Sequence, residues 1–460
     1  MKHEVSKLVQ EDLRHIWHPA AQMKDYEDFP PIAVVRGEGP WLYTEDGRRI
    51  LDVVSSWWCN LLGHCNPEIS EAIADQARTL EHVIFADFTH PWAVEVAQKL
   101  LEILPKGLTR FNFADNGSSS VEMALKMAFQ YQLQTGHPGR KRFACLSEGY
   151  HGETIGALSV GSMDLYARMY QPLMMDNLHV QAPDCFRCPC GKCRGHCNCE
   201  CIKFARKALE EHGHELAALI AEPLLQGAAG MRIYPEEYLR QLKALCHEHG
   251  VLFIADEIAT GFGRTGEVFA CVKAGITPDI MTLSKAITGG YMPMSVVCTT
   301  DEVYEAFYAD WKAGRAFVHS HTYAGNPLAC ACALTVMRIL KRDHVIKKAQ
   351  ETARWLTGES EREFSDLEEC GEIRHIGLIH AIELVKDRKT KEPFPSSLRL
   401  GKRIYRRALS KGLLLRPIGD VLYFNPPLNI RCEELSFALK TASECIRGEL
   451  AMARKESASD

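Results

Sequence analysis

The middle of the chain alternates short apolar runs with longer segments of helical periodicity. Six runs of four to six residues have the length of buried strands: 110–114, 142–147, 217–221, 251–255, 280–283 and 295–299. Between them, apolar positions recur with a period near 3.6; Val121, Ala124, Leu125 and Ala128, for example, mark one face of a helix that follows Ser118. This alternation predicts an α/β fold with a mainly parallel central sheet and helices on both of its faces.

The two ends of the chain have a different pattern. Residues 1–65 mix Pro, Gly and aromatic residues, and an Asp46-Gly47 turn signal lies between two runs that could pair as a hairpin. Residues 331–460 contain helical segments and two apolar runs, which suggests a smaller α+β unit. We therefore predict a large domain over 66–330 and a small domain formed by 1–65 together with 331–460.

Two of the predicted strands end on residues that carry chemistry. The run 251–255 is followed by Asp256 and Glu257, and the run 280–283 by Ser284 and Lys285. Functional groups of parallel sheets gather beyond the carboxyl ends of the strands, so Asp256 and Lys285 should lie near each other. A lysine that can form a Schiff base and an acid that can protonate a pyridine ring are what pyridoxal phosphate needs. The pair predicts that cofactor.

Two other cofactors fit the same strands less well. An apolar strand that ends in Asp-Glu is also typical of the magnesium-binding strand of P-loop ATPases, but the chain contains no G-x-x-x-x-G-K-[ST] segment. The segment 261–266 matches G-x-G-x-x-G, the dinucleotide fingerprint. Its first glycine comes several residues after the strand, whereas the fingerprint needs it in the strand-to-helix turn.

Other segments offer binding groups, each with a simpler structural explanation. Gly117 and Ser118 stand between a strand and a helix, where free N–H groups and the helix dipole favour a phosphate; ordinary capping by Ser118 is the alternative. Tyr150 and Trp57 could line a ligand site or fill a core. Arg416 could clamp a substrate carboxylate or form a surface ion pair.

Composition limits the functional classes. The chain has 460 residues, of which 46% are hydrophobic and 25% charged, as in ordinary globular enzymes. A net charge of −5 argues against nucleic-acid binding. No apolar run approaches the roughly 18 residues of a membrane span, and the N-terminus lacks the apolar core of a signal peptide. We expect a cytoplasmic protein, in which most of the 18 cysteines are thiols or metal ligands.

Seven of these cysteines and His196 fall within residues 185–201. The pairs Cys185/Cys188 and Cys190/Cys193 have the C-x-x-C spacing that lets one metal ion bind two sulfurs. A structural zinc site is the leading interpretation, and an iron–sulfur cluster or a metal-free thiol loop are the alternatives. The segment lies between predicted strands, which indicates an inserted loop rather than the catalytic centre.

Together these motifs resemble the class III, fold-type I aminotransferases. The resemblance covers about residues 15–427 and rests on HIWHP, SSWW, HVIFADFTH, ADNGSSSVEMALKMAFQY, GYHGETIGALSV, IADEIATGFGRTG, LSKAITGG, HTYAGNPLAC and LLRPIGDVLYFNPP. The segments SSWW, FADFTH and RPIG are similar to the corresponding segments of one subgroup of this family. That subgroup converts 8-amino-7-oxononanoate to 7,8-diaminononanoate in biotin biosynthesis. For that subgroup the amino donor is most often S-adenosylmethionine and sometimes lysine.

The resemblance implies a function for individual residues. It implies that Lys285 carries the cofactor and that Asp256 pairs with its ring nitrogen. Phosphate contacts would come from Gly117 and Ser118 and, across a homodimer interface, from His321 and Thr322. Tyr150 would pack on the cofactor ring, and the substrate pocket would consist of Trp57, Tyr150, Lys285, Ser320 and Arg416, with Arg416 on the carboxylate of the oxo acid.

One position departs from the family pattern. An aromatic residue usually follows Trp17-His18-Pro19, and this chain has Ala20. Either the pocket has a gap there, or Tyr26 or another ring fills it. Transamination of another ω-amino substrate, racemase or aminomutase activity on the same fold, and a metal-sensing or metal-storage protein are the other functions that the sequence leaves open.

Overall fold

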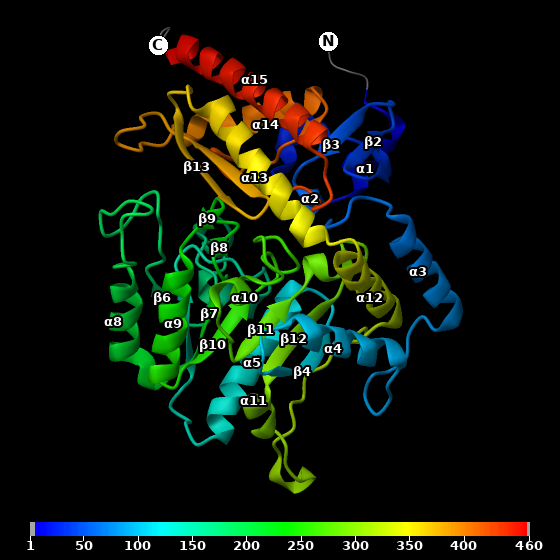
Figure 1. Cartoon of the computed structure of the whole chain (residues 1–460), viewed down its shortest axis with the longest axis vertical. Helices are drawn as coiled ribbons and strands as arrows, with labels where there is room; N and C mark the ends of the chain where they lie inside the picture. The colour runs from blue at the N-terminus through cyan, green and yellow to red at the C-terminus, as the bar shows by residue number, and fades with distance from the viewer. Residues whose placement is uncertain (1–4, 458–460) are drawn as a thin grey trace.

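The computed structural model describes residues 5–457, and its centre is a seven-stranded sheet (Figure 1). The strand order is β4-β12-β11-β10-β7-β5-β6. Only β12 runs antiparallel to its two neighbours, and the other strands share one direction. The strands are β4 (Leu108–Ala114), β5 (Arg142–Leu146), β6 (Leu178–Val180), β7 (Leu216–Ala221), β10 (Leu252–Asp256), β11 (Ile280–Leu283) and β12 (Ser295–Thr300).

Successive residues of the central strands belong alternately to two apolar clusters, one on each face of the sheet. Ile220 and Ile254 pack with α5 (Gly117–Gln134) on one face, whereas Leu219 and Phe253 face the helices on the other. This period of two is what a strand buried on both faces requires. The helices on the second face are α4 (Pro91–Ile103), α8 (Ile202–His212) and α9 (Glu236–Glu248).

The predicted α/β class is confirmed, and all six predicted strands are present. The sequence analysis missed β6, which has only three residues and alternates exposure too briefly to give a pattern. Shorter helices connect the sheet: α6 (Ile155–Ser159), α7 (Asp164–Ala167), α10 (Ala270–Ala274) and α11 (Asp301–Glu305).

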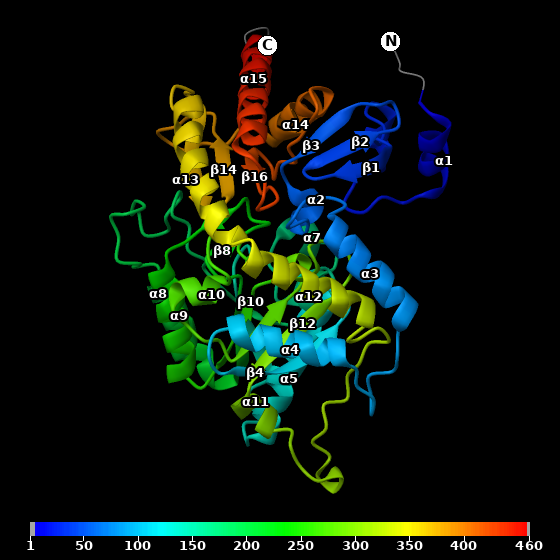
Figure 2. The same cartoon turned by 45° about the vertical axis from the view of Figure 1, so that its right-hand side comes forward.

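The two ends of the chain lie together above the sheet (Figures 1 and 2). β3 (Arg49–Asp52) pairs in parallel with β15 (Leu413–Leu414), which joins segments far apart in sequence. β2 (Trp41–Thr44) and β3 form the hairpin expected around Asp46-Gly47, and β1 (Val34–Glu38) pairs antiparallel with β2. The domain boundaries at residues 65 and 330 stay a prediction.

The rest of this upper part is a three-stranded sheet with long helices. β13 (Cys370–Ile376), β14 (Ile379–Leu384) and β16 (Val421–Phe424) are antiparallel. The helices of the chain ends are α1 (Lys7–His15), α2 (Ser55–Trp58), α13 (Val345–Phe364), α14 (Leu400–Ser410) and α15 (Cys432–Ser457). Two further helices, α3 (Pro67–Thr79) and α12 (Pro327–Arg342), pack against each other, and α12 also packs against α4. In the part of the chain that the structure covers, no helix is long and apolar enough to span a membrane.

The glycines of the segment 261–266 are explained by local packing, which argues against a dinucleotide-binding site in this segment. No helix opens directly after its first glycine, since α10 begins at Ala270. A side chain at Gly263 (φ +99°) would meet Leu428 at 2.8 Å and Ile346 at 2.9 Å. Gly266 (φ +85°) lies against Gly377. These glycines therefore let the loop pack against the C-terminal segments of the chain.

His380 in β14 gives the fold a pH dependence that can be measured. Its ring is 1% exposed, stacks on His375 at 5.1 Å, and has no hydrogen-bond partner on either nitrogen among the described residues. Burial, with a further contribution from His375, lowers the pKa of His380 to about 3. The unfolded chain then binds a proton that the folded chain does not, so stability is lost as the pH falls below about 6.5, at up to roughly 1.4 kcal/mol per pH unit.

We expect His380→Leu to remove that part of the pH dependence. As the pH is lowered from 6.5 to 4.5, the unfolding midpoint of His380→Leu, measured by circular dichroism, should rise steadily relative to that of the wild type. The matched control is His247→Leu, since His247 is exposed. A difference between wild type and His380→Leu that does not change with pH would contradict the assignment.

Candidate active site

A cavity of about 730 Å³ lies at the carboxyl ends of the parallel strands. Residues that directly follow β4, β5, β7, β10 and β11 line it, together with residues of the two chain ends. The predicted residues in its wall are Ala20, Trp57, Gly117, Ser118, Tyr150, Asp256, Lys285 and Arg416. The sheet edge and the chain ends therefore build one site, as the strand-end argument predicted.

Asp256 is the last residue of β10 and is 3% exposed. Its Oδ2 lies 2.6 Å from Nδ1 of His151, a residue that is itself 3% exposed. Its Oδ1 accepts hydrogen bonds from the Ile258 N–H (3.1 Å) and the Thr282 hydroxyl (3.3 Å). A carboxylate that is held on both oxygens is fixed in direction, as an acid that faces a ring nitrogen must be.

Lys285 follows β11 and has a strained backbone. Its φ of +45° lies in the left-handed region, which non-glycine residues adopt at a cost of about 1–3 kcal/mol. Its Nζ lies 4.8 Å from the centre of the Trp58 ring. Burial lowers the pKa of Lys285, while Asp256 and Glu222 oppose that shift. A lysine with a lowered pKa supplies more of the neutral amine that attacks a carbonyl.

The start of α5 forms a cradle for an anion. Asn116 caps the helix, because its side chain accepts a hydrogen bond from the Ser119 N–H at 3.1 Å. The alternative that Ser118 is the cap is therefore wrong. Among the described residues, no protein acceptor takes the N–H groups of Gly117 and Ser118, which lie at the positive end of the helix.

Two glycines keep this cradle open and close to the sheet. A side chain at Gly117 would come within 3.1 Å of Ile258. A side chain at Gly152 would overlap the hydroxyl of Ser118. The cavity thus offers a phosphate cradle, a lysine and a held carboxylate in one space, which fits pyridoxal phosphate.

The SSWW segment forms a tight turn that presents two rings to the cavity. Ser55, Ser56 and Trp58 all have positive φ values, between 51° and 64°. Asp52 stabilises the turn, since its carboxylate accepts from the Ser56 N–H at 2.6 Å and from the Ser56 hydroxyl at 3.1 Å. Trp57 remains 48% exposed at the mouth, while Trp58 is buried.

Arg416 has the geometry of a carboxylate clamp. Its guanidinium carbon lies 4.4 Å above the Trp57 ring. Among residues 5–457 no carboxylate lies within ion-pair distance of it, so the alternative of a surface salt bridge is not supported. A half-buried guanidinium that faces a cavity and lacks an anionic partner is suited to an anionic substrate.

Tyr150 lines the cavity next to a second tyrosine. Its ring lies 5.4 Å from that of Tyr166 in α7, and its hydroxyl donates to Glu153 at 2.9 Å. Tyr26 is not in the cavity wall; its ring packs on His18 at 5.2 Å instead. The gap left by Ala20 is therefore not filled by Tyr26, and Tyr166 and Tyr423 are further tyrosine rings in the wall.

Ser320, His321 and Thr322 do not reach this cavity. They lie in the segment between α11 and α12, which extends away from the body of the molecule in both views (Figures 1 and 2). His321 Nδ1 is 3.1 Å from Asp115, and Ser320 and Thr322 are exposed. Their predicted contacts across a homodimer interface stay a prediction.

The sequence analysis missed Glu222, His151 and Trp58 as members of the site. Glu222 follows β7 and accepts from the Tyr150 N–H (3.1 Å) and the Gly227 N–H (3.0 Å). Burial raises its pKa to about 7, against the opposing influence of His151. The signal was available, because Glu222 is an acid at a strand end like Asp256. Trp58 and His151 stand directly beside residues that were chosen.

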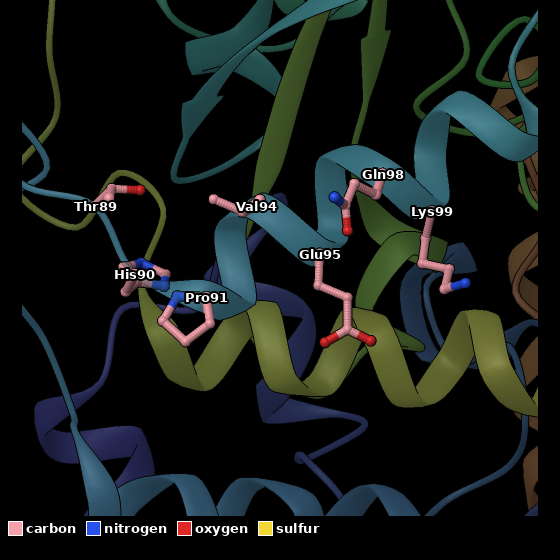
Figure 3. Close-up of a pocket in the computed structure, with 7 residues that line it drawn as sticks. All are labelled: Thr89, His90, Pro91, Val94, Glu95, Gln98 and Lys99. Atoms are coloured by element: carbon pink, nitrogen blue, oxygen red, sulfur yellow. The ribbon is translucent and has the colours of Figure 1, made fainter.

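A second hollow, of about 570 Å³, lies on the first turns of α4 (Figure 3). Its residues include His90, Glu95 and Lys99, with the side chains of Glu95 and Lys99 projecting from the helix. None of the predicted site residues lines it. Its polar groups come from a single helix and the residues at its N-terminus. The hollow therefore contains no functional group from the end of a strand.

Comparison with known proteins agrees with this geometry. The sequence matches the class-III aminotransferase family over residues 22–446. It is 44% identical to the adenosylmethionine-8-amino-7-oxononanoate aminotransferase of Geobacter sulfurreducens, over 93% of this chain and 94% of that protein. It is 38% identical to the protein of the same name from Methanocaldococcus jannaschii, over 95% of this chain and 97% of that one.

Solved structures show the same relationship. The crystal structure of the Methanocaldococcus jannaschii enzyme gives a TM-score of 0.90, at 38% identity, over 96% of this chain and 98% of that one. An omega transaminase from Pseudomonas jessenii in complex with PMP gives 0.92, at 30% identity, over 97% and 99%. The resemblance seen in the sequence is confirmed. The chain belongs to the class-III aminotransferases and is a pyridoxal-phosphate-dependent enzyme.

Proposed function

We propose that this aminotransferase transfers an amino group to 8-amino-7-oxononanoate and forms 7,8-diaminononanoate, a step of biotin biosynthesis, with S-adenosylmethionine as donor. The observation that carries the proposal is the unpaired Arg416 in the same cavity as Lys285 and Asp256. The acceptor bears one carboxylate at the end of an apolar chain. The cavity offers it one guanidinium beside the rings of Trp57 and Tyr150. Two relatives of the chain carry the name of that activity.

The residues of the chain divide the chemistry between them. Bound pyridoxal phosphate supplies the carbonyl that accepts the amino group and the ring that takes up electrons. Asp256, oriented by His151, would pair with the ring nitrogen of the bound cofactor. Nζ of Lys285 takes the proton from the amino-bearing carbon of the donor and later returns a proton to the acceptor. Gly117 and Ser118 hold the phosphate.

An assay with defined donors tests the proposal. The holoenzyme should form 7,8-diaminononanoate from 8-amino-7-oxononanoate with S-adenosylmethionine, and product can be measured by mass spectrometry. Turnover with lysine alone would change the donor but keep the acceptor. Turnover only with other ω-amines would favour the omega-transaminase activity of the Pseudomonas jessenii neighbour and contradict the proposal.

Arg416→Met should weaken acceptor binding far more than it slows chemistry. The change removes a charge-assisted bidentate contact worth about 1.5–3 kcal/mol, so KM for the acceptor should rise on the order of 10- to 100-fold. Arg416→Lys should recover only part of the loss, because an ammonium lacks the planar fork. Steady-state kinetics against the acceptor provide the measurement. An unchanged KM would show that the carboxylate binds elsewhere.

We also propose that two copies of the chain form a homodimer in the cytoplasm and share their active sites. The segment that carries His321 and Thr322 is rich in exposed apolar residues: Trp311 is 89% exposed and Val318 is 86% exposed. An arm of this kind normally packs against a partner. A second copy would let His321 and Thr322 reach the phosphate cradle that they do not reach in their own chain.

Mixing two inactive variants tests this shared site. Lys285→Ala lacks the lysine, and a His321→Ala/Thr322→Ala variant lacks the phosphate contacts of the arm. In a mixed dimer, one site would combine an intact lysine with an intact arm. We expect co-expression of the two variants, with different affinity tags, to restore up to about half of wild-type activity per dimer. A purified mixed dimer that shows no recovery would contradict the arrangement.

A further inference from the structure

The loop of residues 185–201 joins β6 to α8 and plays no part in the chemistry described above (Figure 1). It surrounds a small, partly open hollow of about 20 Å³, whose wall contains six cysteines: Cys185, Cys188, Cys193, Cys197, Cys199 and Cys201. A hollow of this size holds about one water-sized sphere. The linings of this hollow and of the active-site cavity share no residue.

The structure changes which cysteines belong together. Of the predicted pair Cys190/Cys193, Cys193 lines the hollow but is exposed, and Cys190 is not among the residues of the wall. Cys199 is 3% exposed and packs in the hydrophobic core. Four partly buried thiols remain: those of Cys185, Cys188, Cys197 and Cys201.

These four thiols come from two anchored segments. Asp184 holds the first segment, since its carboxylate accepts from the N–H groups of Phe186 (2.9 Å) and Arg187 (2.8 Å). Arg187 also forms an ion pair with Glu383 in β14. In the second segment, Cys201 is the N-cap residue of α8, so its position is fixed by the first turn of that helix.

The charges around the hollow suit a metal thiolate. The thiols of Cys185, Cys188, Cys197 and Cys201 all line the same small hollow, so the four lie close to one another. Four thiolates around a divalent ion leave a net charge of about −2. Lys192 and Arg194 also line the hollow, where each forms an ion pair with one carboxylate, of Glu200 and Glu372 respectively.

We infer that this hollow is a structural zinc site with Cys185, Cys188, Cys197 and Cys201 as its four ligands. As the side chains stand, no three His, Cys, Asp or Glu residues in the described part of the chain form a ready ligand set. Zinc binding therefore requires the thiols to turn into the hollow, to sulfur–metal distances of about 2.3 Å. The ion would tie α8 to the β14 side of the small domain. A single ion, rather than an iron–sulfur cluster, fits the volume.

Metal analysis of serine variants tests the inference. Full-length holoenzyme, purified without metal-affinity resin and equilibrated with buffered zinc, should contain about one zinc per chain. Cys188→Ser and Cys197→Ser should each weaken zinc binding by at least about tenfold. Cys190→Ser and Cys193→Ser, from the same loop, should bind zinc as the wild type does.

Three results would overturn the assignment: no stoichiometric zinc in the wild type, iron together with acid-labile sulfide, or equal losses in the ligand and control variants. If Cys188→Ser or Cys197→Ser fails to fold, wild-type protein titrated with Co²⁺ decides instead. Four thiolate ligands predict intense sulfur-to-cobalt charge-transfer bands with a one-to-one end point. Their absence would also exclude the site.

Discussion

Replacing Lys285 by alanine will abolish transamination and covalent retention of the cofactor. Lys285 is the only lysine in the wall of the cavity that the described residues form, and it lies between the Trp58 ring and the strand end that carries Asp256. Alanine removes both the amine that joins the cofactor and the base that moves the proton. We expect turnover to fall by about 10⁴-fold or more.

Borohydride reduction followed by intact-mass measurement separates this effect from misfolding. Wild-type protein should gain the mass of the reduced cofactor, and Lys285→Ala should not. Lys106→Ala is the matched control, because Lys106 is exposed and lies outside the cavity. A Lys285→Ala protein that still gains the mass on another lysine would overturn the assignment.

Much of this site could be predicted because its residues stand where strands end. When a buried parallel strand ends at an acid or a lysine, that side chain must lie at the carboxyl edge of the sheet. Asp256 and Lys285 could therefore be placed near each other without coordinates. Arg416 and Tyr150 were candidates because of their residue types, and the resemblance to a family suggested what each one binds; both line the cavity. Glu222 obeys the strand-end rule and could have been found in the same way.

The remaining features depend on contacts between distant segments, which periodicity does not encode. Tyr166 lies in a four-residue helix, and only its packing on Tyr150 brings it into the wall. The partnership of His151 with Asp256 joins the ends of two strands that are not neighbours in the sheet.

Asp256→Asn gives the second large effect, and its size tests the electrostatic part of the mechanism. Asparagine has nearly the same shape, and its carbonyl can still accept from the Ile258 N–H and the Thr282 hydroxyl. What it removes is the negative charge opposite the ring nitrogen of the cofactor. Without that charge the ring is a weaker acceptor of electrons, so we expect turnover to fall on the order of 10³-fold.

The neighbouring acid supplies a matched control for that charge. Glu257 is fully buried and does not line the cavity; its carboxylate accepts from the Cys271 N–H at 2.7 Å. Burial raises the pKa of Glu257, so Glu257→Gln replaces a group whose charge is already disfavoured. It should retain activity to within about tenfold.

Single-turnover rates with the amino donor, measured on cofactor-saturated protein, distinguish a catalytic charge from a structural one. If Asp256 acts through its charge, the rate falls in Asp256→Asn while the reduced-cofactor mass and the unfolding midpoint stay close to wild type. If the two variants lose activity equally, the effect comes from disturbing the end of β10. In that case His151 would serve to keep the end of β10 in place, and not to orient a charged carboxylate.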